Sequence, residues 1–125
     1  MWLNFDDKAI STKVVIKIFC KETSIHVKYL NGTQEIVKTY NDEDAIKSAF
    51  TKICYMLEND RIQKWLKIED KIINIEAISK IYCDEIFICV RYPDDTRETI
   101  KIYDDEETMK AEFMAICQTL KAQSF

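Results

Sequence analysis

Apolar and polar side chains alternate along several short stretches of the chain, and the period of this alternation distinguishes strands from helices. Ile18 and Cys20 alternate with Lys17 and Phe19. A period of two is typical of a strand with one apolar face, and the β-branched run Ile10 to Cys20 is interpreted as one long strand. Shorter runs predict further strands at residues 2–5, 25–30 and 35–40.

A different period follows each acidic turn. Apolar residues recur there at intervals of three and four, which predicts a helix with one face on the sheet. Asn41 or Asp42 can cap the free backbone N–H groups at the first helix start, and Asp104 or Asp105 can do so at the second. The apolar helix faces consist of Ile46, Phe50, Ile53, Cys54 and Leu57, and of Met109, Phe113, Ile116, Cys117 and Leu120.

The chain repeats itself. Laid over each other without a gap, residues 2–62 and 65–125 match at about 23 of 61 positions, which is a strong sign of duplication. Each half is interpreted as four antiparallel strands followed by one helix, so we expect an α+β fold built from a tandem ββββα unit. The strands of the second half are predicted at residues 65–68, 72–83, 86–92 and 98–103.

The two repeats are expected to form one compact domain over residues 1–125. The join at residues 58–64 contains no glycine, proline or serine, so it is not a flexible linker. A four-stranded sheet with one helix leaves its other face and its edge strands uncovered. Packing of the two copies about a pseudo-twofold axis would cover them, and we expect this arrangement.

Composition restricts the classes of function. The net charge of −4 argues against broad, non-specific binding to nucleic acid or to an anionic membrane. The N-terminal residues show no basic segment followed by an apolar run, so no signal peptide is predicted, and no apolar stretch is long enough to span a membrane. Five cysteines without a Cys-x-x-Cys pair then indicate reduced thiols in a cytoplasmic protein.

No motif for catalysis, for a metal or for a cofactor is found. A single glycine in the chain excludes phosphate-binding loops of the P-loop or dinucleotide kind. The acidic stretches at residues 42–44 and 104–107 lack the ligand spacing of a calcium loop, and helix capping explains them. The only histidine, His26, has no flanking signature of a nucleophilic pair. We therefore predict no enzymatic activity, no metal and no cofactor.

Strand alternation predicts cations and aromatic rings on the sheet face that points away from the helix. If Ile18 and Cys20 face the helix, Lys17 and Phe19 point away from it. The same reasoning applies to the neighbouring strands and to the second half, and most acids lie in turns and at helix starts. The candidate nucleic-acid or partner face comprises Lys17, Phe19, Lys28, Lys38, Tyr40, Lys80, Tyr82, Arg91, Lys101 and Tyr103.

The residues leave two leading functions open, with a small apolar ligand bound between the two sheets as a third. The first is a small interaction module that binds a protein partner or itself through its sheet edges or its outer face. The alternative is single-stranded nucleic acid on that face, since cations can follow the phosphates and rings can stack on bases. The salt dependence of binding distinguishes a protein partner from nucleic acid, because only for nucleic acid is the affinity expected to fall steeply with salt as counterions are released.

Tandem four-strand-and-helix units resemble the Whirly and Pur-alpha type of single-strand-binding proteins. The residue pairs that carry the resemblance, all on predicted strands, are Lys17 and Lys80, Phe19 and Tyr82, and Lys38 and Lys101. The resemblance implies single-strand binding on the sheets. Separately, the pattern Trp-Leu-x-Ile-x-Asp-Lys-Ile-Ile-Asn-Ile at residues 65–75 resembles the opening of small uncharacterised bacterial proteins, which implies no function.

Overall fold

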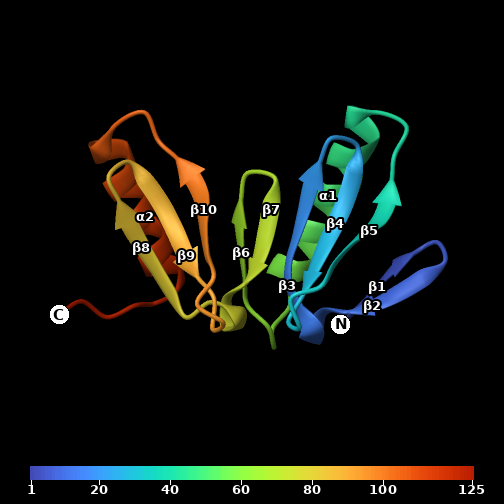
Figure 1. Ribbon diagram of the computed structural model, residues 1–125, viewed down its shortest axis with the longest axis horizontal. Helices are drawn as coiled ribbons and strands as arrows, with labels where there is room; N and C mark the ends of the chain where they lie inside the picture. The colour runs from blue at the N-terminus through green and yellow to red at the C-terminus, as the bar shows by residue number, and fades with distance from the viewer. The chain divides into compact units, whose positions relative to one another are not determined.

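Helices and strands follow one order twice along the chain in the computed structural model, which describes residues 1–125 (Figure 1). The first half contains β1 (Trp2–Phe5), β2 (Lys8–Ser11), the 3₁₀ turn η1 (Thr12–Val14), β3 (Val15–Lys21), β4 (Ser24–Tyr29), β5 (Gln34–Thr39) and α1 (Glu43–Glu58). The second half contains β6 (Trp65–Ile68), β7 (Lys71–Asn74), the 3₁₀ turn η2 (Ile75–Ala77), β8 (Lys80–Asp84), β9 (Phe87–Arg91), β10 (Arg97–Ile102) and α2 (Glu106–Thr119). The fold is therefore α+β, and every pair of neighbouring strands is antiparallel.

The chain divides into two compact units, residues 1–77 and residues 78–125. The first unit contains the two-stranded sheet β1–β2 and a five-stranded sheet in the order β5-β4-β3-β7-β6. The second unit contains a three-stranded sheet in the order β10-β9-β8. The hairpin β6–β7 lies in the predicted second repeat but joins the sheet of the first unit. The boundary between the units consequently lies after η2 and not at the join between the repeats.

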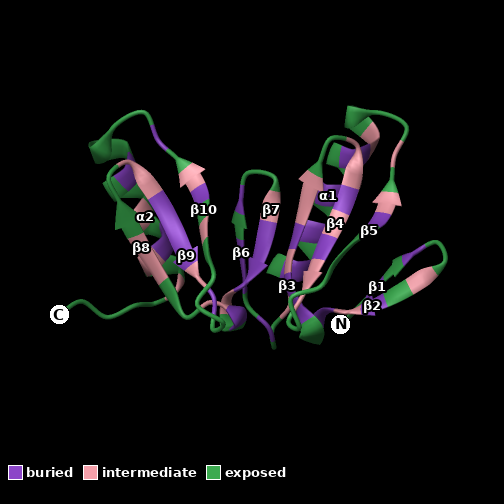
Figure 2. Ribbon diagram, viewed as in Figure 1, coloured by how far each residue is buried: buried purple, intermediate pink, exposed green.

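The core of the first unit lies between its five-stranded sheet and α1. Ile18, Ile25 and Val27 are completely buried on the side of the sheet that α1 covers, and Phe50 and Leu57 of the helix belong to the same apolar cluster (Figure 2). Burial of this apolar surface stabilises the sheet and the helix against each other. The helix spacing of the apolar residues was predicted from the sequence, and all five predicted residues of α1 are buried.

The second unit has the same arrangement with a smaller buried helix face. Ile88 and Val90 of β9 are completely buried, and α2 contacts this strand. Only Met109 and Ile116 of α2 are buried, whereas Phe113 and Cys117 of this helix and Leu120 at its C-cap, which were also predicted in the core, are partly exposed.

Both predicted helix starts are confirmed. The Asp42 side chain accepts a hydrogen bond from the backbone N–H of Ala45 at 2.8 Å, and the Asp105 side chain accepts one from Thr108 at 2.7 Å. Hydrogen bonds to its carboxylate hold the pKa of Asp105 below its ordinary value. Each aspartate therefore satisfies a backbone donor that the helix itself leaves unpaired.

The prediction of one long strand from Ile10 to Cys20 is wrong, because η1 divides this run into β2 and β3. At the start of η1 the backbone N–H of Thr12 donates to the Met1 carbonyl at 2.9 Å, and at η2 its counterpart Ile75 donates to the Lys64 carbonyl at 3.0 Å. Thr12 makes two further contacts with residues that are distant in sequence. Its side chain donates a hydrogen bond to the Met1 carbonyl at 3.0 Å and lies 3.4 Å from Oε1 of Gln63. The predicted strand at residues 72–83 is divided by η2 in the same way. Each half accordingly has five strands and not four.

A β-bulge interrupts the alternation of the last strand in each half. His26 pairs with Ile36 and Ile25 pairs with Lys38, so Val37 is the additional residue on β5. On β10 the additional residue is Ile100, which lies between the pairs of Thr99 with Cys89 and Lys101 with Ile88. An extra residue in one strand reverses the faces to which the following side chains point.

Replacing Glu22 by glycine is expected to stabilise the protein. Glu22 occupies the β3–β4 turn with φ of 58°, a left-handed conformation that disfavours any residue with a Cβ atom. We expect the free energy of unfolding to rise by about 0.5–1 kcal/mol in urea denaturation, because relief of strain exceeds the added flexibility of the unfolded chain. The neighbouring Lys21→Gly variant, in ordinary strand geometry, should be destabilised instead. Loss of stability in both variants would show that the turn is unstrained.

Candidate nucleic-acid interface

The outer face of the first unit, on the side of its sheet opposite α1, carries two lysines and two rings on neighbouring strands. Lys17 of β3 pairs with Lys28 of β4, and Phe19 pairs with His26. Paired residues of antiparallel strands point to the same side, and the intervening Ile18 is completely buried on the α1 side. Lys17, Phe19, His26 and Lys28 are named here the first outer face.

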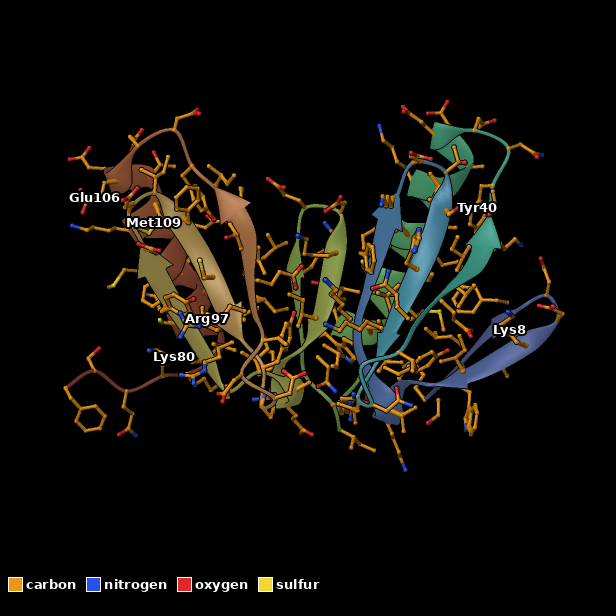
Figure 3. The ribbon with its side chains drawn as sticks, in the orientation of Figure 1. Lys8, Tyr40, Lys80, Arg97, Glu106 and Met109 are labelled. Atoms are coloured by element: carbon orange, nitrogen blue, oxygen red, sulfur yellow. The ribbon has the colours of Figure 1, made fainter.

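The outer face of the second unit carries a row of three cations. Lys80 of β8 pairs with Arg91 of β9, and Arg91 pairs with Arg97 of β10. Tyr82 lies two residues further along β8 and points to the same side of the sheet. Lys80 and Arg97 lie toward the same end of this unit in Figure 3. Lys80, Tyr82, Arg91 and Arg97 are named the second outer face.

Aromatic rings position the lysines on both outer faces. The Nζ atom of Lys17 lies 4.8 Å from the centroid of the Phe19 ring, and that of Lys80 lies 5.2 Å from the centroid of the Tyr82 ring. At these distances the electron-rich ring face attracts the ammonium group. The Phe19 ring is also stacked on His26, with centroids 4.9 Å apart and an interplanar angle of 16°. Lys17 and Lys80 therefore each lie over a ring, and Phe19 and His26 stack on each other.

One cation of the second outer face is partly neutralised. The guanidinium of Arg91 donates to Oδ1 of Asp95 from Nη2 at 2.6 Å and from Nε at 3.1 Å. Asp95 lies in the β9–β10 turn with φ of 70°. This ion pair fixes the orientation of Arg91, so Lys80 and Arg97 provide most of the positive charge of the row.

Four residues of the predicted face lie on the other side of their sheets. The bulge at Val37 directs Lys38 to the side of the buried Ile25, and Tyr40 packs against the apolar core of the first unit. Burial raises the pKa of Tyr40 above its ordinary value. The Nζ atom of Lys38 is 3.1 Å from Oδ1 of Asp6 in the β1–β2 turn.

The second unit shows the same displacement. The bulge at Ile100 places Lys101 beside the buried Ile88, and the side chain of Tyr103 is only 7% exposed. Lys38 and Lys101 each lie over the ring of the tyrosine two residues later, at 5.2 and 5.0 Å. The structure therefore separates these two lysine–tyrosine pairs from the outer faces.

The predicted site omitted Arg97. The last strand of the second half was predicted to begin at Glu98, whereas β10 begins at Arg97 and thereby adds this residue to the row of cations. His26 was likewise left out of the predicted site, although the alternation of β4 places it beside Phe19. No sequence signal identified Arg97, because its counterpart Gln34, which begins β5, was likewise left outside the predicted strand at residues 35–40.

The helix side of the first unit is acidic by comparison. A groove of about 590 Å³ beside α1 is lined by four carboxylate residues, Glu22, Glu43, Glu69 and Asp70, and by two lysines, Lys47 and Lys67. Negative charge repels the phosphates of nucleic acid. Of the two sides of this unit, the first outer face is therefore the better one for an anionic polymer.

The remaining chemistry of the chain is limited. All five cysteines are free, and no group of three or more His, Cys, Asp or Glu side chains is arranged to hold a metal ion. Burial raises the pKa of the Cys20 thiol to about 11 and that of Cys54 to about 12, so both remain protonated at neutral pH. Neither helix is long and apolar enough to cross a membrane.

The chain is similar in structure to a solved chain, the LytTr DNA-binding domain of a response regulator from Bacillus cereus. The TM-score is 0.57 and the sequence identity is 14%, and the match covers 93% of this chain and 94% of that one. At this identity the similarity concerns the fold. No protein-family model matches the chain, and neither does any curated protein.

Proposed function

We propose that the chain binds DNA, and that the outer faces hold the phosphates. The observation that carries the proposal is the row of Lys80, Arg91 and Arg97 across three neighbouring strands, with Lys17 and Lys28 arranged likewise on the first unit. The similarity of fold to a domain described as DNA-binding supports it. Nucleic-acid binding, the alternative function expected from the sequence, thus has a parallel in a solved domain of similar fold.

The spacing of the cations suits a phosphate backbone. Neighbouring strands lie about 4.8 Å apart, so three paired residues span roughly 10 Å of a sheet. Phosphates of one DNA strand rise roughly 3.4 Å each along the helix axis and lie further apart than this along the backbone, so the row has the reach of about two of them. Cations on a rigid sheet lose little freedom on binding, which favours the complex.

Phosphate contacts are better supported than base stacking. The Phe19 ring is stacked on His26 and the Tyr82 ring lies under Lys80, so a base would have to displace these contacts. We infer that the rings orient the cations, and that duplex DNA is bound at least as well as a single strand. The hypothesis of single-strand binding, which the Whirly and Pur-alpha resemblance implies, predicts the opposite order of affinities.

Fluorescence anisotropy of labelled DNA tests the proposal. Duplex and single-stranded oligonucleotides are titrated with protein at several salt concentrations. With three to four phosphate contacts, the slope of log affinity against log salt is expected to lie between about −2 and −4. Binding that is insensitive to salt would favour a protein partner as the function, and absence of binding even at low salt would overturn the proposal.

We also propose that the two halves are copies of one unit. The bulges support this, because they occupy equivalent positions although the bulged residues differ, Val37 in one half and Ile100 in the other. The turn before the last strand is also shared. Asn31 accepts hydrogen bonds from Thr33, and Asp94 accepts the same two from Thr96. Local geometry is thus repeated where the sequence is not.

A further inference from the structure

The hairpin β6–β7 completes the sheet of the first unit by pairing along β3. Ile72 of β7 pairs with Ile18 of β3, and the backbone N–H of Cys20 donates to the Asp70 carbonyl at 2.9 Å. The side chain of Asn74 donates to the Val15 carbonyl at 3.1 Å. One hairpin of the second repeat therefore serves as the outer two strands for the first.

The equivalent pairing is missing in the second unit. β8 is the counterpart of β3, and it lies at the edge of a three-stranded sheet. The counterpart of β6–β7 is the hairpin β1–β2, which forms a two-stranded sheet of its own (Figure 1). Each chain thus has one edge strand, β8, whose counterpart β3 pairs with a hairpin, and one hairpin, β1–β2, whose counterpart β6–β7 pairs with β3. Unpaired edge strands readily pair with another strand.

Burial differs between the halves where this pairing is missing. Trp65 on β6 is 6% exposed, whereas its counterpart Trp2 on β1 is 68% exposed. Ile18 is completely buried, but Ile81 on β8 is only partly buried. Leu57 of α1 is completely buried, whereas its counterpart Leu120, at the C-cap of α2, is partly exposed. The hairpin β1–β2 and the β8 edge therefore both expose apolar residues whose counterparts are buried in the first unit.

We propose that a second copy of this chain supplies its hairpin β1–β2 to the β8 edge. The repeat fixes the register, since the pairs of β3 with β7 have equivalents 63 residues away in β8 and β2. The expected pairs are Lys80 with Ile10, Ile81 with Ala9, and Tyr82 with Lys8 of the second copy. Trp2 of that copy then covers the apolar end of α2, as Trp65 is buried with Leu57 in the core cluster of the first unit. This inference does not depend on DNA binding.

The donor hairpin and the acceptor edge are different surfaces, so the contact is head to tail. Such a contact closes into a ring where the rotation between copies permits, and otherwise extends into a chain of copies. Strand addition of this kind uses backbone hydrogen bonds for affinity and side-chain pockets for specificity. Here Trp2 and the partly exposed face of α2 form the apolar component.

Proline at Ala9 tests the pairing. The Asp70 carbonyl accepts from Cys20 and so points toward β3, away from β6. Residues two apart along a strand direct their backbone groups to the same side, so the N–H of Ile72 also points away from β6. By the repeat, the N–H of Ala9 points away from β1. Ala9→Pro removes that donor and leaves the hydrogen bonds between β1 and β2 in place. Asn4→Pro is the matched control, because Asn4 pairs with Ala9 and its N–H points to the opposite edge of the same hairpin.

Light scattering at increasing protein concentration gives the result. The average mass of the unaltered chain and of Asn4→Pro is expected to rise to at least twice the monomer mass of 14.8 kDa. The average mass of Ala9→Pro is expected to remain at that of the monomer. Circular dichroism shows that the variants are folded. A monomer at every concentration for the unaltered chain would overturn the proposal, as would assembly of Ala9→Pro equal to that of the control.

Disulfide trapping keeps the proposal testable if the proline variants do not fold. In a Cys83→Ser background, a chain with Ala9→Cys is mixed with a chain with Ile81→Cys and oxidised. The expected product is a disulfide between positions 9 and 81 in peptide mapping by mass spectrometry. Ala9→Cys mixed with Ile102→Cys is the control, since Ile102 is exposed on β10, pairs with Phe87 and lies away from the β8 edge. Equal yields in both mixtures would overturn the proposed register.

Discussion

Replacing Lys17 and Lys80 together by glutamate is expected to weaken DNA binding about 100-fold at low salt. Each replacement removes a phosphate contact from one outer face and places a carboxylate there, so attraction becomes repulsion. The salt dependence should change as well, because each lost phosphate contact lowers the slope of log affinity against log salt by roughly 1. Anisotropy titrations of one labelled duplex, with both proteins at the same salt concentrations, measure both effects.

The chain offers a matched control for this experiment. Lys38 and Lys101 also lie over tyrosine rings, but the bulges place them on the opposite sides of their sheets. Lys38→Glu with Lys101→Glu changes the net charge by the same amount as the first pair. Its affinity is expected to fall less than threefold, since charges away from the contact act through screened, long-range interactions. Equal losses in the two variants would mean that overall charge, and not the outer faces, determines binding.

Replacing Ile18 by alanine is expected to lower the free energy of unfolding by about 3–4 kcal/mol. Ile18 is completely buried between β4, β7 and the helix side of the first unit, where its removal leaves a cavity that surrounding side chains cannot fill. The counterpart variant Ile81→Ala should lose only about 1 kcal/mol, because β8 is an edge strand and Ile81 is already partly exposed.

Urea denaturation followed by circular dichroism measures the two losses. Tryptophan fluorescence would not serve for Ile81, because Trp2 and Trp65 both belong to the first unit. The protein concentration is kept low, so that contacts between copies do not contribute to the burial of Ile81. Equal destabilisation by the two replacements would contradict the difference in burial on which the proposed strand addition rests.

The sequence predicted the elements that depend on local pattern. The first strand of each half, the two helices and their aspartate caps are found where the periods and the capping residues indicated them. These features are set by neighbours within a few residues, which a short window of sequence contains. The polar and apolar sides of β4, and of β3 from Lys17 onward, were predictable for the same reason, whereas a register shift between Val15 and Lys17 places Val15 in the core.

Features that depend on distant contacts were not predictable. The run from Ile10 to Cys20 has the composition of one strand, and the break at Thr12 coincides with a backbone hydrogen bond to Met1 that local composition does not record. The pairing of β7 with β3 joins residues more than fifty positions apart, and no local pattern records it. In the candidate site, the bulges displaced Lys38, Tyr40, Lys101 and Tyr103, because alternation alone does not reveal an inserted residue.

The two bulges have a consequence for how this chain can change in evolution. Removal of a single codon at Val37 or Ile100 would restore regular alternation and exchange the surfaces on which the next lysine and tyrosine are displayed. Such a deletion would move a cation and a ring from the interior side to the outer face without any substitution. A change in the length of one strand is thus a shorter mutational route to a new charged surface than replacing each residue in turn.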